Sequence, residues 1–140
     1  MPAFRPTSFI VHALLAACAG LFAGGAMAAD LKLTGDQEVP ANTSTAVGTG
    51  NITIAEDGSV SGSVAAPTLQ ATAAHIHVGA KGVNGPVIIP LTGGPGGTWS
   101  VPAGAKLTGE QMEAYKAGNL YVNVHTAEHK GGEIRTQLMP

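Results

Sequence analysis

Apolar and polar residues alternate in short segments along most of this 140-residue chain. Turn residues separate these segments about every ten residues, as in proteins made of short antiparallel strands. The segment NITIAEDGSVSGSV shows the alternation best and predicts a hairpin. A two-residue turn at Asp57-Gly58 would place its apolar residues on opposite faces, whereas a three-residue loop at 56–58 pairs Ile54 with Val60. The alternation therefore favours the three-residue loop, with Gly58 in the left-handed region.

The middle of the chain predicts two further strands. AHIHV places Ile76 on one face of a strand and both His75 and His77 on the other. GVNGPVIIPL predicts a turn at Asn84-Gly85 and a short apolar strand that ends near Pro90. Because proline cannot donate a ladder hydrogen bond, this strand is expected at a sheet edge or to stop there.

LYVNVHT and EIRTQL predict a last hairpin around a loop at 127–131. The cross-strand pairs expected on its apolar, core-facing side are Leu120–Leu138, Val122–Thr136 and Val124–Ile134. The pairs expected on its other side are Tyr121–Gln137, Asn123–Arg135 and His125–Glu133. Shifting the register by two residues keeps this division of faces. One side of the hairpin thus carries a histidine, an amide, an acid and an arginine in a row.

One short helix is expected at about 109–117. Thr108 can cap its first turn, Gln111 completes a capping box three residues later, and Gly118 can end it. Many short strands with a single helix predict an all-β fold. We expect one antiparallel Greek-key β-sandwich or barrel, of the superoxide-dismutase-like or immunoglobulin-like kind.

The first thirty residues differ from the rest of the chain. Arg5 is followed by the uncharged run FIVHALLAACAGLFAGG, and AMA at 26–28 has the small-x-small form of a signal-peptidase site. This pattern predicts a signal peptide at 1–28, a mature domain at 29–140 and a periplasmic or secreted protein, with no membrane span. A second interpretation is that LAAC is a lipobox, in which Cys18 would be acylated and become the first mature residue.

The mature composition limits the partners of this protein. Six Lys and Arg face nine Asp and Glu after residue 28, a net charge of −3, which argues against nucleic acid and against an anionic membrane surface. The only cysteine lies in the expected signal peptide. An exported domain of this size without a disulfide must depend on its core or on a bound ligand.

The histidines of the mature chain fall in two short stretches, His75/His77 and His125/His129. A His-x-His pair on a strand projects two imidazoles to one side, about 6–7 Å apart at Cα. A neighbouring hairpin could add the other ligands of a single ion. Imidazole ligands without thiolate suit Cu(II) or Zn(II), and the Irving–Williams order favours copper over zinc. Around these metal ligands we expect an outer shell of Asn123, Glu133 and Arg135, with Glu133 accepting a ligand's second N–H.

Other patterns argue against catalysis. The chain shows no G-x-S-x-G elbow, no phosphate-binding glycine loop before a helix and no evident pair of catalytic carboxylates. Trp99 is expected to anchor the core or its rim. The alternative to a metal site is an extracellular adhesion or protein-binding module, whose histidines only form hydrogen bonds across strands.

The two histidine segments also carry a family resemblance. AAHIHVGAKGVNGPVIIPL, GNLYVNVHTAEHKGGEIRTQL and the early LTGDQEVP closely resemble the CHRD domain, over about residues 30–138. That domain is named for its repeats in the animal protein chordin, where its role concerns growth-factor binding, and it occurs singly in exported bacterial proteins. The resemblance implies an extracellular or periplasmic β-sandwich and no particular activity.

A looser likeness is to copper–zinc superoxide dismutases, which also place His-x-His on a strand of a Greek-key barrel. Their disulfide, long zinc loop and zinc His/Asp cluster have no counterpart in this sequence. The likeness therefore does not imply dismutase activity.

Overall fold

A computed structural model describes residues 28–140. Except for Ala28, the expected signal peptide and its Cys18 lie outside these residues, so cleavage and acylation stay predictions. The elements in chain order are β1 (Asp30–Leu33), the 3₁₀ helix η1 (Gly35–Gln37), β2 (Gly48–Ile54), β3 (Val60–Ala65), β4 (Ala71–Val78), β5 (Val87–Pro90), β6 (Thr92–Gly93), the 3₁₀ helix η2 (Pro95–Gly97), β7 (Thr98–Ser100), α1 (Gly109–Lys116), β8 (Leu120–Thr126) and β9 (Ile134–Leu138).

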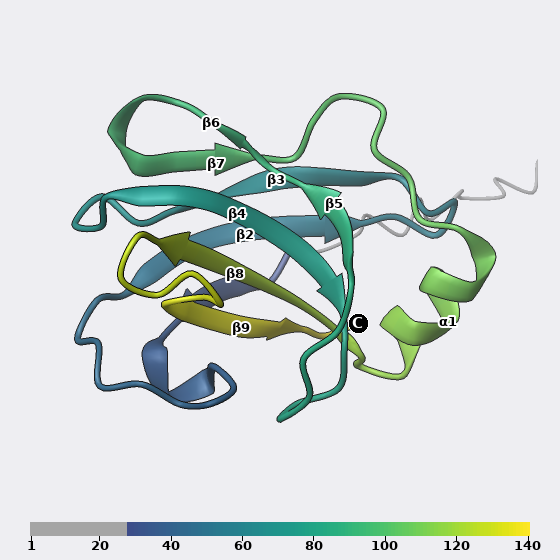
Figure 1. Cartoon of the computed structure of the whole chain (residues 1–140). Coiled ribbons are helices and arrows are strands. Elements are labelled where there is room, and N and C mark those ends of the chain that lie inside the picture. The colour runs from purple at the N-terminus through teal and green to yellow at the C-terminus, as the bar shows by residue number, and fades with distance from the viewer. Residues whose placement is uncertain (1–27) are drawn as a thin grey trace, which may run out of the picture.

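Two antiparallel sheets lie face to face, with α1 at one end of the pair (Figure 1). One sheet has the strand order β1-β2-β3-β7-β6, and the other has the order β5-β4-β8-β9. The expected sandwich is therefore confirmed. The barrel alternative is wrong, because the two sheets stay separate and join only through an isolated bridge between Thr34 and Arg135.

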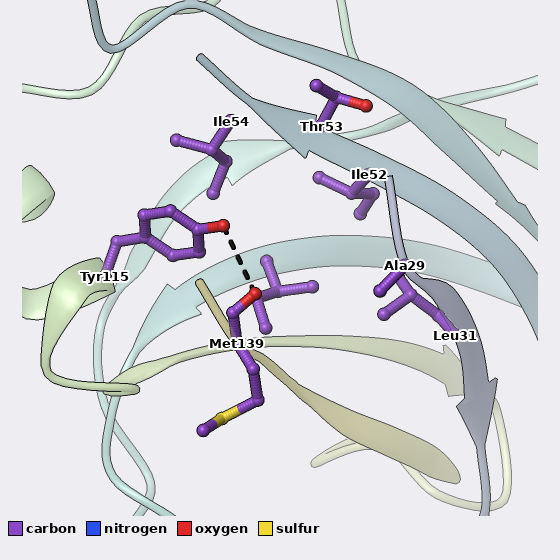
Figure 2. A pocket seen from close by; sticks show the side chains of 8 residues that line it. Ala29, Leu31, Ile52, Thr53, Ile54, Tyr115 and Met139 are labelled. Atoms are coloured by element: carbon purple, nitrogen blue, oxygen red, sulfur yellow. Dashed lines mark hydrogen bonds between the residues drawn. The ribbon is translucent and has the colours of Figure 1, made fainter. Parts of the chain in front are cut away.

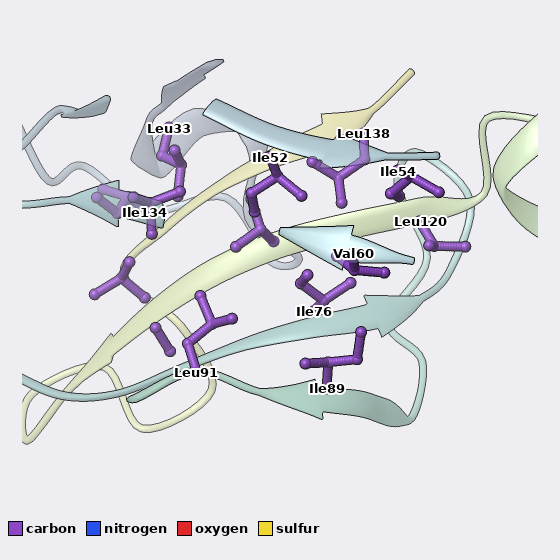
Figure 3. Close-up of a cluster of buried hydrophobic side chains, with 14 of the residues drawn as sticks. Leu33, Ile52, Ile54, Val60, Ile76, Ile89, Leu91, Leu120, Ile134 and Leu138 are labelled. Atoms are coloured by element: carbon purple, nitrogen blue, oxygen red, sulfur yellow. The ribbon is translucent and has the colours of Figure 1, made fainter. Parts of the chain in front are cut away.

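The core lies between the sheets and is filled by every second residue of the central strands (Figure 3). Its larger buried members are Leu33, Ile52, Ile54, Val60, Val64, Ile76, Ile89, Leu91, Leu120, Val122, Val124, Ile134 and Leu138. Burying one such side chain contributes about 1.5–3 kcal/mol, so this layer supplies most of the driving force for folding. Trp99 is partly buried and packs against the core, as expected for a rim anchor.

Local sequence rules hold at the hairpins and at the helix. Ile54 pairs with Val60 around a three-residue loop, and Gly58 has φ +87°. Val124 pairs with Ile134, so β8 and β9 have the predicted register. Thr108 and Gln111 form the expected capping box of α1. The strand that ends at Pro90, β5, is an edge strand as predicted.

The outer face of the four-stranded sheet is not the solvent-facing side that its polar residues suggested. Segments 34–46 and 79–86 fold over it, so that Tyr121, Asn123 and Arg135 are at most 2% exposed. A second, polar layer is thus buried outside the apolar core. Among the described residues, no helix has the length and apolar character needed to span a membrane.

Candidate metal centre

The pairing of β4 with β8 brings three histidines together. His75 lies opposite Asn123, and His125 lies opposite Ala73, two residues along the same ladder. Since alternate residues share a face, His75, His77 and His125 all project to the outer side of the sheet. One nitrogen of each ring lies within 4.8 Å of the others, and His75 Nδ1 is 3.0 Å from His125 Nε2. The predicted convergence of these three rings is present.

Asn123 lies between two of the rings. Its Oδ1 is 3.0 Å from His77 Nε2 and 2.9 Å from His125 Nε2. The sequence placed Asn123 in an outer shell, but its oxygen belongs to the same cluster as the nitrogens. The group therefore offers three imidazole nitrogens and one amide oxygen.

Backbone carbonyls fix the tautomers of two rings. His77 Nδ1 lies 2.9 Å from the Gly85 carbonyl oxygen, and His125 Nδ1 lies 2.8 Å from the Lys130 carbonyl oxygen. A carbonyl oxygen only accepts, so each Nδ1 must carry the proton. In a neutral imidazole the Nε2 lone pair then points into the cluster. This outer-shell arrangement is the one that metal-binding histidines use in proteins.

Lone pairs therefore face one another inside the cluster. Neither His77 Nε2 nor His125 Nε2 has a proton to donate to the Asn123 oxygen when the rings are neutral. Protonating a ring would relieve this repulsion, but burial, followed by the neighbouring histidines' charges, lowers the pKa of His75. Burial also lowers the pKa of His77, which is 7% exposed. A metal cation would satisfy all of these lone pairs at once.

A stack of three side chains supports His77 from β8 and β9. The Tyr121 ring lies parallel to the His77 ring, with 4.6 Å between centroids and an angle of 4°. The guanidinium of Arg135 lies on the other side of Tyr121, 3.4 Å from the ring centroid. Tyr121 Oη also accepts a hydrogen bond from Gly85 N–H at 3.1 Å. The tyrosine thus contacts both the imidazole and Gly85, the residue whose carbonyl oxygen accepts from that imidazole.

Arg135 holds the loop that carries Gly85. Its Nη2 donates to the carbonyl oxygens of Ala80 and Val83, both at 3.0 Å, and its Nη1 donates to Asn84 Oδ1 at 3.3 Å. Arg135 is 1% exposed. Its contacts therefore support His77 through the stack and through the loop.

Glu38 is a buried acid that the sequence did not single out. It follows η1 and is 4% exposed, and its Oε1 has no hydrogen-bond partner of good geometry within residues 28–140. Burial raises its pKa to about 7, although nearby Asn123 and Arg135 both lower it. Its Oε1 and the Asn123 Nδ2 lie against the same point, where a Cβ on Gly132 would overlap them. Glu38 therefore lies behind Asn123, on the side away from the histidines.

Two predicted site residues lie elsewhere. His129 is outside the three-histidine group, because its backbone closes the turn to Thr126 and Gly132. Glu133 does not accept from a histidine, because the ladder ends at Val124–Ile134 and strand parity no longer applies to it. Its carboxylate accepts instead from Thr126 Oγ1 at 2.6 Å and Ser44 Oγ at 2.7 Å. Burial raises the pKa of Glu133, but these two hydrogen bonds and the charge of His129 together outweigh it and leave that pKa lowered.

Other hollows of the described chain offer less chemistry. A cavity of about 30 Å³ lies between α1, β1 and β2. Figure 2 shows Tyr115 at its side, where the hydroxyl donates to the Met139 carbonyl oxygen; the two oxygens are 3.2 Å apart. This cavity has room for a few water molecules at most. A wider polar hollow of about 540 Å³ lies where β4 begins and β8 ends. Its buried acid, Glu133, is already paired, so neither hollow rivals the histidine cluster.

Parts of the site left little trace in the sequence. The carbonyls of Gly85 and Lys130 are backbone groups, which no residue pattern marks. Glu38 and Tyr121 join the site because loops fold over a face that strand alternation alone leaves open. The available signal was the density of large polar residues in YVNVHT and EIRTQ, which is unusual for a solvent-facing strand side.

Comparison with known proteins gives one match. A family model described as the CHRD domain matches residues 30–138, nearly the whole of the described chain. No curated protein matches the sequence. No solved structure matches the fold.

Proposed function

The chain belongs to the CHRD domain family, and we propose that it is an exported protein that binds one metal ion through His75, His77 and His125. The observation that carries this proposal is the convergence of three imidazole nitrogens and the Asn123 oxygen on one point. The backbone acceptors at Gly85 and Lys130 keep the rings in the tautomers that bind metal. With neutral rings and no cation, the Asn123 oxygen faces the lone pairs of His77 Nε2 and His125 Nε2, acceptor against acceptor.

Copper is the preferred ion and zinc is the second choice. Metal–nitrogen distances of about 2.0–2.1 Å require ligand nitrogens roughly 3–4 Å apart, close to the spacing of this cluster. Three imidazoles and an amide oxygen, with no thiolate, suit Cu(II) or Zn(II), and the Irving–Williams order favours copper. His75 and His125 are only partly buried, so an ion can reach the cluster from solvent.

The alternative function is an adhesion or protein-binding module without a metal. In that role the three rings would only form hydrogen bonds across strands. The cluster supports this less well, because one proton, on His75 Nδ1, can satisfy one contact and leaves the Asn123 oxygen facing two lone pairs. No catalytic activity is proposed.

Metal analysis of untagged protein from the exported fraction tests the proposal. We expect about one copper or zinc ion per chain. His77→Ala and His125→Ala should abolish binding, because each removes a ligand held by its own backbone acceptor. His129→Ala is the matched control and should leave binding unchanged. Metal-free protein that takes up neither Cu²⁺ nor Zn²⁺ would favour the protein-binding module.

Export is a separate proposal. Removal of residues 1–28 would leave Ala29 as the first residue of a periplasmic or secreted protein. The intact mass of the exported form tests it. A diacylated N-terminal Cys18 would instead establish the lipoprotein interpretation.

A further inference from the structure

Glu38 occupies a position that the polar layer alone does not explain. It is a buried carboxyl group without an ion pair, since the described residues hold only one salt bridge, Lys116–Glu113 on the surface. Nearby Arg135 donates its side-chain hydrogen bonds to Ala80, Val83, Asn84 and Gln137 rather than to Glu38. Ionising a buried, unpaired acid is costly, so a cation held at the neighbouring site would stabilise its carboxylate form.

The amide of Asn123 connects Glu38 to the histidines. Its Oδ1 faces His77 and His125, and its Nδ2 faces Glu38 and the Gly131 carbonyl oxygen, which is 3.5 Å away. An amide has one accepting and one donating end. An acid behind the donating end therefore keeps the oxygen directed at the metal position.

The approach of Glu38 to this amide depends on a glycine. Gly132 has φ +124°, and a Cβ at this position would overlap both Glu38 Oε1 and Asn123 Nδ2. The backbone conformation and the missing side chain together leave the space in which acid and amide meet.

The geometry points to Glu38 as the residue that makes the site selective for divalent over monovalent ions, an inference that rests on the proposed metal role. Glu38 acts in two ways, and both favour binding of a divalent ion. It holds a hard oxygen donor toward the ion, which soft monovalent ions such as Cu⁺ and Ag⁺ use poorly. Its negative charge also attracts an ion in proportion to that ion's charge, so a dication gains twice as much.

The test compares Zn²⁺ with Ag⁺, using the purified protein at pH 8. We expect Glu38→Gln to weaken Zn²⁺ binding about tenfold or more, as outer-shell substitutions do. Ag⁺ binding should change by less than about threefold, since the charge and oxygen effects on a soft monovalent ion are smaller. Glu128→Gln, which removes an exposed acid from the β8–β9 loop, is the matched control and should alter neither affinity.

A double-mutant cycle separates this role from general loosening. In an Asn123→Ala background, Glu38→Gln should lose much of its effect on Zn²⁺, because the oxygen it orients is gone. Equal weakening of both ions, or no change in either, would overturn the inference. In that outcome, wild-type binding that is lost in His77→Ala would leave the proposed metal site standing. Wild-type protein that binds neither ion would overturn both.

Discussion

The guanidinium of Arg135 lies 3.4 Å from the centre of the Tyr121 ring and is almost completely buried. Such a cation must be held by its partners, because water does not reach it. Arginine supplies a planar fork that both stacks on the ring and donates to the loop carbonyls, whereas lysine offers one point charge. The planar shape of arginine therefore suits both the stack and the hydrogen bonds to the loop.

Replacing Arg135 should therefore cost much stability. We expect Arg135→Met to lower the free energy of unfolding by about 3 kcal/mol or more, because it leaves the Val83 carbonyl without its side-chain donor and removes one of the two donors to the Ala80 carbonyl. Arg135→Lys should recover only part of this loss. Urea unfolding measures both. Lys116→Met, which breaks the exposed pair with Glu113, is the control and should cost at most about 0.5 kcal/mol.

Two glycines of the loop over the site should respond very differently to alanine. A Cβ on Gly85 would overlap the Val78 carbonyl oxygen, so Gly85→Ala must displace the peptide that fixes His77. We expect a loss of about 3 kcal/mol and a large loss of metal affinity. Gly82→Ala meets no atom within 4 Å and should cost only the left-handed strain of φ +80°, about 1–2 kcal/mol. Equal effects of the two substitutions would contradict the proposed role of the Gly85 carbonyl.

The metal-free protein should depend on pH through Glu38. Burial raises the pKa of Glu38 from 4.5 to about 7, so the folded state binds its proton more tightly than the unfolded state. Its contribution is fully present below pH 4.5 and is lost as the pH rises through 7, at a cost of roughly 3 kcal/mol. Unfolding of wild type and Glu38→Gln at several pH values measures this. Relative to wild type, the free energy of unfolding of Glu38→Gln should rise between pH 4.5 and 7.5, and the difference should then level off.

Metal binding should show the opposite pH dependence. Protons compete with the ion for the imidazole lone pairs, so affinity should fall as the pH drops below the imidazole range near 6.5. The pKa values of His75 and His77 are lowered, first by burial, so these two rings resist protonation further into the acid range than a free imidazole. Titration of Zn²⁺ binding between pH 5 and 8 tests this. An affinity that rises on acidification would exclude histidine ligation.

Rules that depend on neighbouring residues in the sequence correctly predicted a hairpin loop and the start of the helix. Strand parity at Ile54 and Val60 fixed a loop length, and a Thr108–Gln111 box fixed a helix start, because both depend on neighbours in sequence. Parity also placed His75, His77 and His125 on one face. Because β4 and β8 pair directly, these three histidines also lie close to one another.

Predictions that depended on loops were less successful. His129 was expected as a ligand, but it lies outside the three-histidine group, in a turn closed by backbone hydrogen bonds that do not follow from residue type. The prediction for Glu133 assumed that strand alternation continues to its position, but the ladder ends one residue earlier, at Val124–Ile134. Glu38 went unnoticed because it is 85 residues from Asn123 in sequence, and only the folding of segment 34–46 over the sheet brings the two together.

The ladder between β4 and β8 has a consequence for the order of folding and loading. Backbone hydrogen bonds between these strands place the three histidines on one face, so the proposed ion would bind to ligands that the fold has already brought together. Binding and release of the proposed ion would then need little backbone rearrangement. The two forms would differ mainly in electric potential at one partly exposed patch. A molecule that distinguished them would have to sense that charge rather than a change of shape.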